Sequence, residues 1–418
     1  MHGKKTSSVA DFTQSDSFRK VAASFLSIFI GVAVGALIIL VIAFFDSDIT
    51  VKSGLEGMKL LFLGVFNKGR SDAGELLFGF NGVNIGNMLF RATPVIMTGL
   101  SVAFAFKAGL FNIGAPGQYL IGTAATLITA LSIPSDVIHP TLIWLLAFLS
   151  GMLFGALWGI IPGFFRAYLN INEVLSSIMT NWIAANLVTW IFENSPLRNG
   201  AESGKVGYIM KTSANGVMTA KLGLDKLFPG SQLNSGFLVS CLFAVIIYVL
   251  ISKTVFGFEL KACGSNRFAA QYAGIKSKNR IITAMAIAGS LSGAGAALYY
   301  LSGNTEFFWS TYQSLPFEGF RGIPIALLAL SNPIGVIFSG CFMSALSIAG
   351  QQLKNFTAYS EYVTDIIIAV IVYISAFSLI LRNLLSRKRQ AKESATTFPV
   401  NLAKKEIETE NENIPEEE

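Results

Sequence analysis

Amide side chains and glycines interrupt one of the most apolar parts of the chain, at residues 106–122, FKAGLFNIGAPGQYLIG. Asn112 and Gln118 each donate and accept hydrogen bonds without carrying charge. Gly114 and Gly117 lie between them and favour a backbone that departs from helical geometry. At membrane depth such a departure is tolerated only where it faces protein or a water-filled cavity, and its amides can then hydrogen-bond a polar solute.

A local structural role for the same residues stays open. Asn112 would then cap the helix that begins near Gly114, with Pro116 in the first turn of that helix. Lys107 would extend its ammonium group towards the inner membrane surface. The two roles are compatible, since a capping amide can also contact a solute.

Hydroxyl side chains form a second candidate group, in the stretch INEVLSSIMTNW. Ser176, Ser177 and Thr180 fall on one face of the predicted helix, at i, i+1 and i+4. Asn172 is expected to cap this helix, and Glu173 in the first turn complements the helix dipole. The hydroxyls can line a gate or hydrogen-bond neighbouring helices, and the spacing fits both.

Groups for catalysis or metal binding are scarce. The two histidines, His2 and His139, have no accompanying carboxylate pair or nucleophile motif, and no phosphate-binding G-x-x-x-x-G-K-[ST] loop occurs. Cys241, Cys263 and Cys341 are odd in number and lack the spacing of a metal site. We therefore expect no enzyme activity, no ATPase site, no metal and no bound cofactor in this chain.

The composition places these groups in a membrane protein. Hydrophobic residues make up 52% of the 418, charged residues only 13%, and mean hydropathy is +0.57, so the chain cannot fold as a water-soluble globule. Its apolar runs predict an all-α polytopic membrane protein of about ten helices. The small residues of SLSGAGA indicate close packing within one of them. The predicted spans cover residues 21–45, 86–106, 114–131, 141–165, 174–192, 236–253, 281–301, 322–332, 335–350 and 363–381.

Basic residues near the spans set the predicted orientation, because lysine and arginine are retained on the cytoplasmic side. With both termini inside, 19 of the 31 basic residues are cytoplasmic. The net charge of +6 therefore indicates anchoring to an anionic inner leaflet, and no nucleic-acid partner is expected. Ionisable residues lie only near the ends of the predicted spans, at Arg91, Glu173 and Asp365, which argues against an ion-coupled carrier.

The longest predicted cytoplasmic connection, residues 256–280, offers a surface for a partner. Ser265 or Asn266 can start a short helix there, and Gly274 can end it in the left-handed conformation. A helix of about eight residues is marginal in water, so it requires a partner surface. An interfacial turn with ordinary positive-inside charge is the alternative. The small face of this helix consists of Ala269, Ala270 and Ala273.

Four motifs in the same order resemble one family of transport proteins. ACGSNRFAAQYAGI resembles the coupling motif A-x-G-x-N-x-x-A-A-x-x-x-G-I of permeases of ATP-binding-cassette (ABC) importers for branched-chain amino acids, simple sugars and nucleosides. TPVIMTGLSVAFAFKAGLFNIGAPGQYLIG is similar to the nucleoside branch, whose binding lipoproteins belong to the basic membrane protein family. INEVLSSIMTNWIA, GIPIALLALSNPIG and the final predicted span also fit, so the resemblance covers about residues 85–385.

The resemblance implies a permease subunit in the bacterial cell membrane, with two inverted groups of four spans and discontinuous helices. Its partners would be a second homologous permease, a cytoplasmic ATPase that hydrolyses ATP, and an extracellular substrate-binding lipoprotein. The solute would be a nucleoside or, alternatively, a simple sugar. Two other classes of protein stay open: an ion-coupled carrier, and a structural or receptor subunit. Candidate pathway residues are Asn112, Gly114, Gly117, Gln118, Ser176, Ser177 and Thr180, and candidate coupling residues are Gly264, Asn266, Ala269, Ala270 and Gly274.

Two positions depart from the family pattern. Pro116 stands where a glutamate is usual, and Arg321 precedes Gly322 where an acidic residue is common. The first bears on the polarity of the broken segment, and the second on the outer gate or the docking surface. The predicted organisation is a cytoplasmic segment at 1–20, a transmembrane permease domain at 21–385 with a coupling helix at 264–275, and a disordered charged cytoplasmic tail at 386–418.

Overall fold

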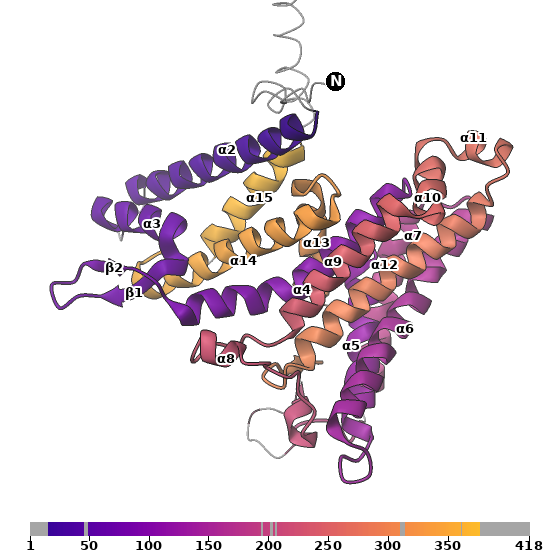
Figure 1. Cartoon of the computed structure of the whole chain (residues 1–418). Helices are drawn as coiled ribbons and strands as arrows, with labels where there is room; N and C mark the ends of the chain where they lie inside the picture. The colour runs from indigo at the N-terminus through magenta and orange to yellow at the C-terminus, as the bar shows by residue number, and fades with distance from the viewer. Residues whose placement is uncertain are drawn as a thin grey trace, which may run out of the picture.

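The computed structural model describes residues 16–45, 49–193, 195–200, 204, 207–309, 314–360 and 362–376. Within these ranges the chain is almost entirely helical, with two small two-stranded sheets (Figure 1). Each of the ten predicted apolar runs coincides with a helix, which confirms the all-α polytopic class. The predicted tail at 386–418 and most of the segment at 1–20 lie outside the described residues.

Helices dominate the order of elements along the chain. Seven of the described helices are long and apolar enough to cross a membrane: α2, α4, α6, α7, α9, α12 and α14. The helix bounds are α2 Asp16–Phe45, α3 Val51–Leu63, α4 Gly82–Lys107, α5 Ala115–Ser132, α6 Pro140–Tyr168, α7 Glu173–Glu193, α8 Leu224–Leu227, α9 Gly236–Lys253, α10 Val255–Ser265, α11 Arg267–Tyr272, α12 Ser277–Tyr300, α13 Phe317–Leu328, α14 Pro333–Phe356 and α15 Tyr362–Ala376. The strands are β1 Asn67–Arg70 and β2 Leu76–Phe78, which pair antiparallel, and β3 Tyr208–Ile209 and β4 Phe307–Phe308, which do the same.

Glycines set the closest helix crossing, between α6 and α12. Gly151 and Gly155 on α6 face Gly289 and Gly293 on α12, and successive contacts are four positions apart on each helix. A Cβ atom on Gly293 would overlap the carbonyl oxygen of Gly151, and one on Gly289 would overlap that of Gly155. Small residues at this spacing let helix backbones approach in a membrane protein, which confirms the packing predicted for SLSGAGA.

Helix α4 lies at the centre and contacts α9, α12, α13 and α14. It is buried along nearly its whole second half, including Thr98 and Ser101. Figure 1 shows α2, α3, α14 and α15 on one side of this helix and α5, α6, α7 and α12 on the other. The short helices α10 and α11 extend beyond one end of α12.

The eighth helix begins earlier than the apolar pattern predicts. The expected span was 322–332, but α13 covers Phe317–Leu328. Charged Glu318 and Arg321 break the hydropathy pattern, yet packing of this helix on α4 and α5 holds them in the first turns. It ends before Leu330 and Ser331, which both have positive φ.

The following helix starts where the Asn-Pro dipeptide predicted a boundary. The Oδ1 atom of Asn332 accepts hydrogen bonds from the amides of Ile334 and Gly335 at 3.0 and 3.2 Å, and Pro333 occupies the first helical position. An asparagine cap followed by proline is a common helix start.

Candidate functional site

The broken segment FNIGAPGQ connects α4 to α5. Helix α5 begins at Ala115 with Gly114 as its N-cap, and Pro116 occupies its first turn as predicted. The alternative role left open for Asn112, capping of this helix, is not found, because no side chain caps it. The amide of Asn112 is bonded elsewhere instead.

Asn112 and Gln118 bond to each other through both halves of their amides. Asn112 Nδ2 donates to Gln118 Oε1 at 2.8 Å, and Gln118 Nε2 donates back to Asn112 Oδ1 at 3.1 Å. Asn112 Nδ2 also donates to Ser101 Oγ of α4 at 3.0 Å, and that hydroxyl accepts from Ser292 Oγ of α12 at 3.0 Å. Both amides are fully buried. The broken segment is thus tied to α4, α5 and α12 by neutral polar groups.

Helix α7 holds the same segment from the other side through Asn181. Its Oδ1 atom accepts from the amide of Gly117 at 2.9 Å, and its Nδ2 atom donates to the carbonyl of Ile113 at 3.0 Å. A Cβ atom on Gly117 would come within 2.6 Å of Asn181 Oδ1, so glycine is required there. Asn181 was not among the predicted site residues, although it directly follows Thr180 in the stretch INEVLSSIMTNW.

The three predicted hydroxyls of α7 divide between two places. Ser176, Ser177 and Thr180 are buried, and the hydroxyls of Ser176 and Thr180 donate to backbone carbonyls one turn earlier. Ser177 Oγ has no hydrogen-bond partner among the described residues, and a Cβ atom on Gly114 would lie 3.1 Å from it. The structure therefore brings Ser177 to the start of α5, whereas Ser176 and Thr180 border a groove between α6 and α7.

The start of α7 follows the local rules expected from the sequence. Asn172 Oδ1 accepts from the amide of Val174 at 2.8 Å, as predicted for a cap. Glu173 lies in the first turn and pairs with Arg166 at the end of α6, at 3.2 Å. Beside this corner, α6 and α7 enclose an apolar groove of about 360 Å³ that includes Trp158 and Met179.

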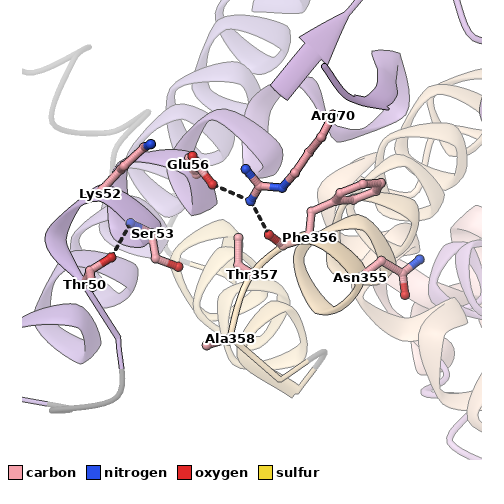
Figure 2. A pocket seen from close by; sticks show the side chains of 9 residues that line it. All are labelled: Thr50, Lys52, Ser53, Glu56, Arg70, Asn355, Phe356, Thr357 and Ala358. Carbon is pink, nitrogen blue, oxygen red and sulfur yellow. Dashed lines mark hydrogen bonds and ion pairs between the residues drawn. The ribbon is translucent and has the colours of Figure 1, made fainter. Parts of the chain in front are cut away.

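A larger open cavity of about 480 Å³ lies away from the broken segment, between α3, β1 and the end of α14. Figure 2 shows Arg70 at its centre. Its guanidinium pairs with Glu56 at 2.6 Å and donates to the carbonyl of Phe356 at 2.6 Å. These bonds fasten the β1–β2 hairpin to α3 and α14, which gives the arginine a structural role.

The predicted coupling region contains two helices. Asn266 is the cap of α11, because its Oδ1 atom accepts from the amide of Ala269 at 3.0 Å, and Gly274 has the predicted positive φ of 82°. Gly264 belongs to the last turn of α10 instead. Ala270 is only 4% exposed and faces the protein.

Aromatic side chains form the outward surface of α11. Tyr272 is 94% exposed and Phe268 is 74% exposed. Exposed Ala269 lies between them along the helix. We call Phe268, Ala269 and Tyr272 the coupling surface.

The coupling region contacts the backbone that leads from α4 into the broken segment, through two glycines. Gly264 packs against the backbone just after α4, and a Cβ atom on it would lie 2.7 Å from the Gly109 nitrogen and from the Lys107 carbonyl oxygen. Gly109 itself has φ of +69°. Arg267 of α11 adds a hydrogen bond of 3.1 Å to the carbonyl of Ala167 at the end of α6. Nothing in the sequence pattern pointed to this backbone contact.

Two further charged residues lie in the first turns of α13, half-buried against neighbouring helices. Glu318 and Arg321 belong to α13, and Arg321 Nη2 lies 3.7 Å from Asp365 Oδ1 of α15. Gly319, between the two, packs against the backbone of Pro116. Pro116 therefore lies at the contact between α5 and α13, whereas Arg321 lies at the contact between α13 and α15.

Known proteins similar to this chain are membrane permeases. The family model for the branched-chain amino acid transport system permease component matches residues 84–376. The guanosine ABC transporter permease NupP of Bacillus subtilis is 33% identical over 87% of this chain and 95% of its own length. The nucleoside ABC transporter permease NupB of Lactococcus lactis is 33% identical over 91% and 97%. The glucose ABC transporter permease TsgB13 of Haloferax volcanii is 30% identical over 68% and 74%.

The family match covers most of the chain and includes both the broken segment and the coupling region. Two relatives at 33% identity align with it almost from end to end. Together with the helical membrane fold, these matches show that the chain belongs to the family of branched-chain amino acid transport system permease components.

Proposed function

We propose that this chain is the permease subunit of an ABC importer that moves nucleosides into the cell. The observation that carries the proposal is the 33% identity, over nearly their whole length, with permeases named for guanosine and for nucleosides. The buried amides of Asn112 and Gln118 support it, because they offer donors and acceptors to a polar solute without attracting an ion.

The proposed importer contains further subunits. A cytoplasmic ATPase binds the coupling surface and hydrolyses ATP, since this chain supplies no site for that reaction. A second homologous permease completes the pathway, and an extracellular lipoprotein delivers the solute. Both termini of this chain lie in the cytoplasm of a bacterial cell, as the distribution of basic residues indicates.

The contact between Gly264 and Gly109 gives the proposed importer a direct mechanical link. When the ATPases close, they push α11, and α10 transmits this movement to the backbone that follows α4. The broken segment and the start of α5 then shift relative to α7, where Ser177 and Asn181 lie. A rigid-body shift of this kind switches the pathway between inward-facing and outward-facing states.

A simple-sugar importer is the second candidate. The glucose permease of Haloferax volcanii is 30% identical over 68% of this chain. Neutral amides suit a sugar as well as a nucleoside, because both solutes carry hydroxyl groups that donate and accept hydrogen bonds.

Uptake of labelled guanosine and uridine by cells with and without the gene separates the two candidates. We expect deletion to abolish nucleoside uptake in a strain without other nucleoside carriers, and unlabelled nucleosides to compete where excess ribose or glucose does not. Unchanged nucleoside uptake in the deletion strain, with loss of glucose or ribose uptake, would establish the sugar importer instead.

Replacing both aromatic residues of the coupling surface is expected to detach the ATPase. Phe268→Ala combined with Tyr272→Ala should weaken ATPase binding by about tenfold or more, since aromatic anchors each contribute about 2 kcal/mol or more at such interfaces. Ala270 is unsuitable for this test, because a larger side chain at a buried position would also disturb packing.

Co-purification of the ATPase with the tagged permease measures this effect. Phe80→Ala serves as the control, since Phe80 is 68% exposed and lies between β2 and α4, far along the chain from α11. Full ATPase recovery and normal uptake by the double variant would refute the assignment of the coupling surface.

A further inference from the structure

Glu318 lies beside the middle of the central helix. The hydroxyl of Thr98, well inside α4, donates to the backbone carbonyl of Glu318 at 2.9 Å, and Gly322 packs against the backbone of Thr98. Gly319 touches the backbone of Pro116 in the first turn of α5. Glu318 is therefore held deep in the helical bundle, where the starts of α13 and α5 meet.

The carboxylate of Glu318 is not committed to a protein partner. It is half-buried, and none of the hydrogen bonds or ion pairs among the described residues involves it. Arg321, one turn further along α13, pairs with Asp365 at 3.7 Å. A carboxylate within a membrane domain is costly and is retained where it has a function.

Tyr119 lies on the helix that packs against the start of α13. It follows Pro116 by one turn of α5, and Gly319 touches the backbone of Pro116. The hydroxyl of Tyr119 is fully buried and has no hydrogen-bond partner among the described residues. Tyr119 also belongs to the same buried cluster as Tyr300 of α12. An acceptor and an unused hydroxyl thus lie where the starts of α5 and α13 pack together.

We propose that the carboxylate of Glu318, assisted by the hydroxyl of Tyr119, binds a pair of adjacent hydrogen-bond donors on the transported solute. The proposal rests on the nucleoside importer proposed above. A carboxylate accepts two parallel hydrogen bonds from neighbouring donors, and charge-assisted bonds of this type are strong. A nucleoside carries two such pairs: the N1–H and 2-amino group of guanine, and the 2′- and 3′-hydroxyls of ribose.

The nearest arginine along α13 leaves the oxygens of Glu318 accessible. This is Arg321, one helical turn further on. Arg321 faces the ring of Phe317 at 4.4 Å and the carboxylate of Asp365, so its guanidinium does not occupy the oxygens of Glu318. A neutral solute with two donors can therefore replace water at the carboxylate without displacing an ion pair.

Glu318→Gln tests this assignment in the assembled importer, by initial uptake rates of guanosine, inosine and 2′-deoxyguanosine. Inosine lacks the 2-amino group and 2′-deoxyguanosine lacks one hydroxyl of the diol. Loss of one charge-assisted hydrogen bond changes a rate by about 10- to 100-fold. We expect the wild type to favour guanosine over one of the two analogues by such a factor, and Glu318→Gln to remove that preference.

The analogue for which the preference is lost identifies the pair of donors that Glu318 binds. A lost preference over inosine assigns the guanine edge, and a lost preference over 2′-deoxyguanosine assigns the ribose diol; either result supports the proposal. Unchanged preferences, or an equal loss for all three solutes, would overturn it and leave Glu318 as a counter-charge for the arginines. Absence of nucleoside uptake by the wild type would overturn the proposed function itself.

Two further variants protect the test against misfolding. Glu75→Gln removes an exposed carboxylate of the β1–β2 hairpin and should leave all three rates unchanged. Tyr119→Phe removes only the unpartnered hydroxyl and should reduce the same preference that Glu318→Gln abolishes. If Glu318→Gln does not fold, an unaltered preference in Tyr119→Phe overturns the proposal.

Discussion

Gly264→Val is expected to reduce uptake strongly while leaving the chain folded and bound to its ATPase. A Cβ atom at this position would lie 2.7–2.8 Å from backbone atoms of Lys107, Ala108 and Gly109, and backbone cannot move aside as a side chain can. The end of α10 must therefore separate from the backbone that follows α4. Uptake should fall by up to about 30-fold, because changes in a coupling network alter its free energy by up to about 2 kcal/mol.

The contact between Gly264 and Gly109 predicts that a change on either side has the same effect. Gly109→Ala should reproduce the phenotype, because Gly109 has φ of +69° and its Cβ atom would lie 2.8 Å from Gly264. Gly200→Ala is the matched control, since nothing lies within 4 Å of its Cβ position. Uptake, ATP hydrolysis and ATPase co-purification should be measured together. Normal uptake by Gly264→Val would show that the contact between Gly264 and Gly109 does not transmit the movement of the ATPases.

Gly293→Leu should have the largest effect on stability. Its Cβ atom would overlap the carbonyl oxygen of Gly151, so α12 must move away from α6 along the closest crossing in the fold. Overpacking of a well-packed interior costs about 1–3 kcal/mol, occasionally more, against a total stability of about 5–15 kcal/mol. We therefore expect a clearly lower thermal midpoint and a reduced yield of folded protein, since the loss is a large fraction of the total stability.

Recovery of monodisperse protein in a mild detergent, with its thermal midpoint, measures this loss. Ala286→Leu introduces the same side chain on the less buried side of α12 and should retain most of the folded protein. Equal recovery of the two variants would contradict the claim that the glycine crossing holds α6 and α12 together.

Local chemistry made the helices and several of their ends predictable. Ten apolar runs coincide with ten helices because a bilayer requires both length and hydropathy. Asn172, Asn266 and Gly274 act at helix ends as expected, since a cap depends on a few neighbouring residues. The capping role left open for Asn112 is not found because a long-range bond to Ser101 competes with the local one.

The sequence pattern could not predict contacts between segments that are distant along the chain. The approach of Gly264, in the last turn of α10, to Gly109, just after α4, joins segments separated by five helices and leaves no periodic signal. Glu318 was overlooked because an apolar window rejects charged residues, whereas tertiary packing on α4 places its helix inside the bundle. The role of Asn181 was likewise not predictable, because it depends on Gly117, 64 positions away in the chain.

The paired amides of Asn112 and Gln118 have a consequence for throughput. Because each satisfies the other when no solute is present, neither of these two buried amides is left unbonded. An arriving solute must exchange existing bonds for new ones of similar strength, so its net gain at this point is small. In the proposed importer this amide pair therefore holds the solute only briefly. Selective capture from a dilute medium is then the task of the extracellular lipoprotein.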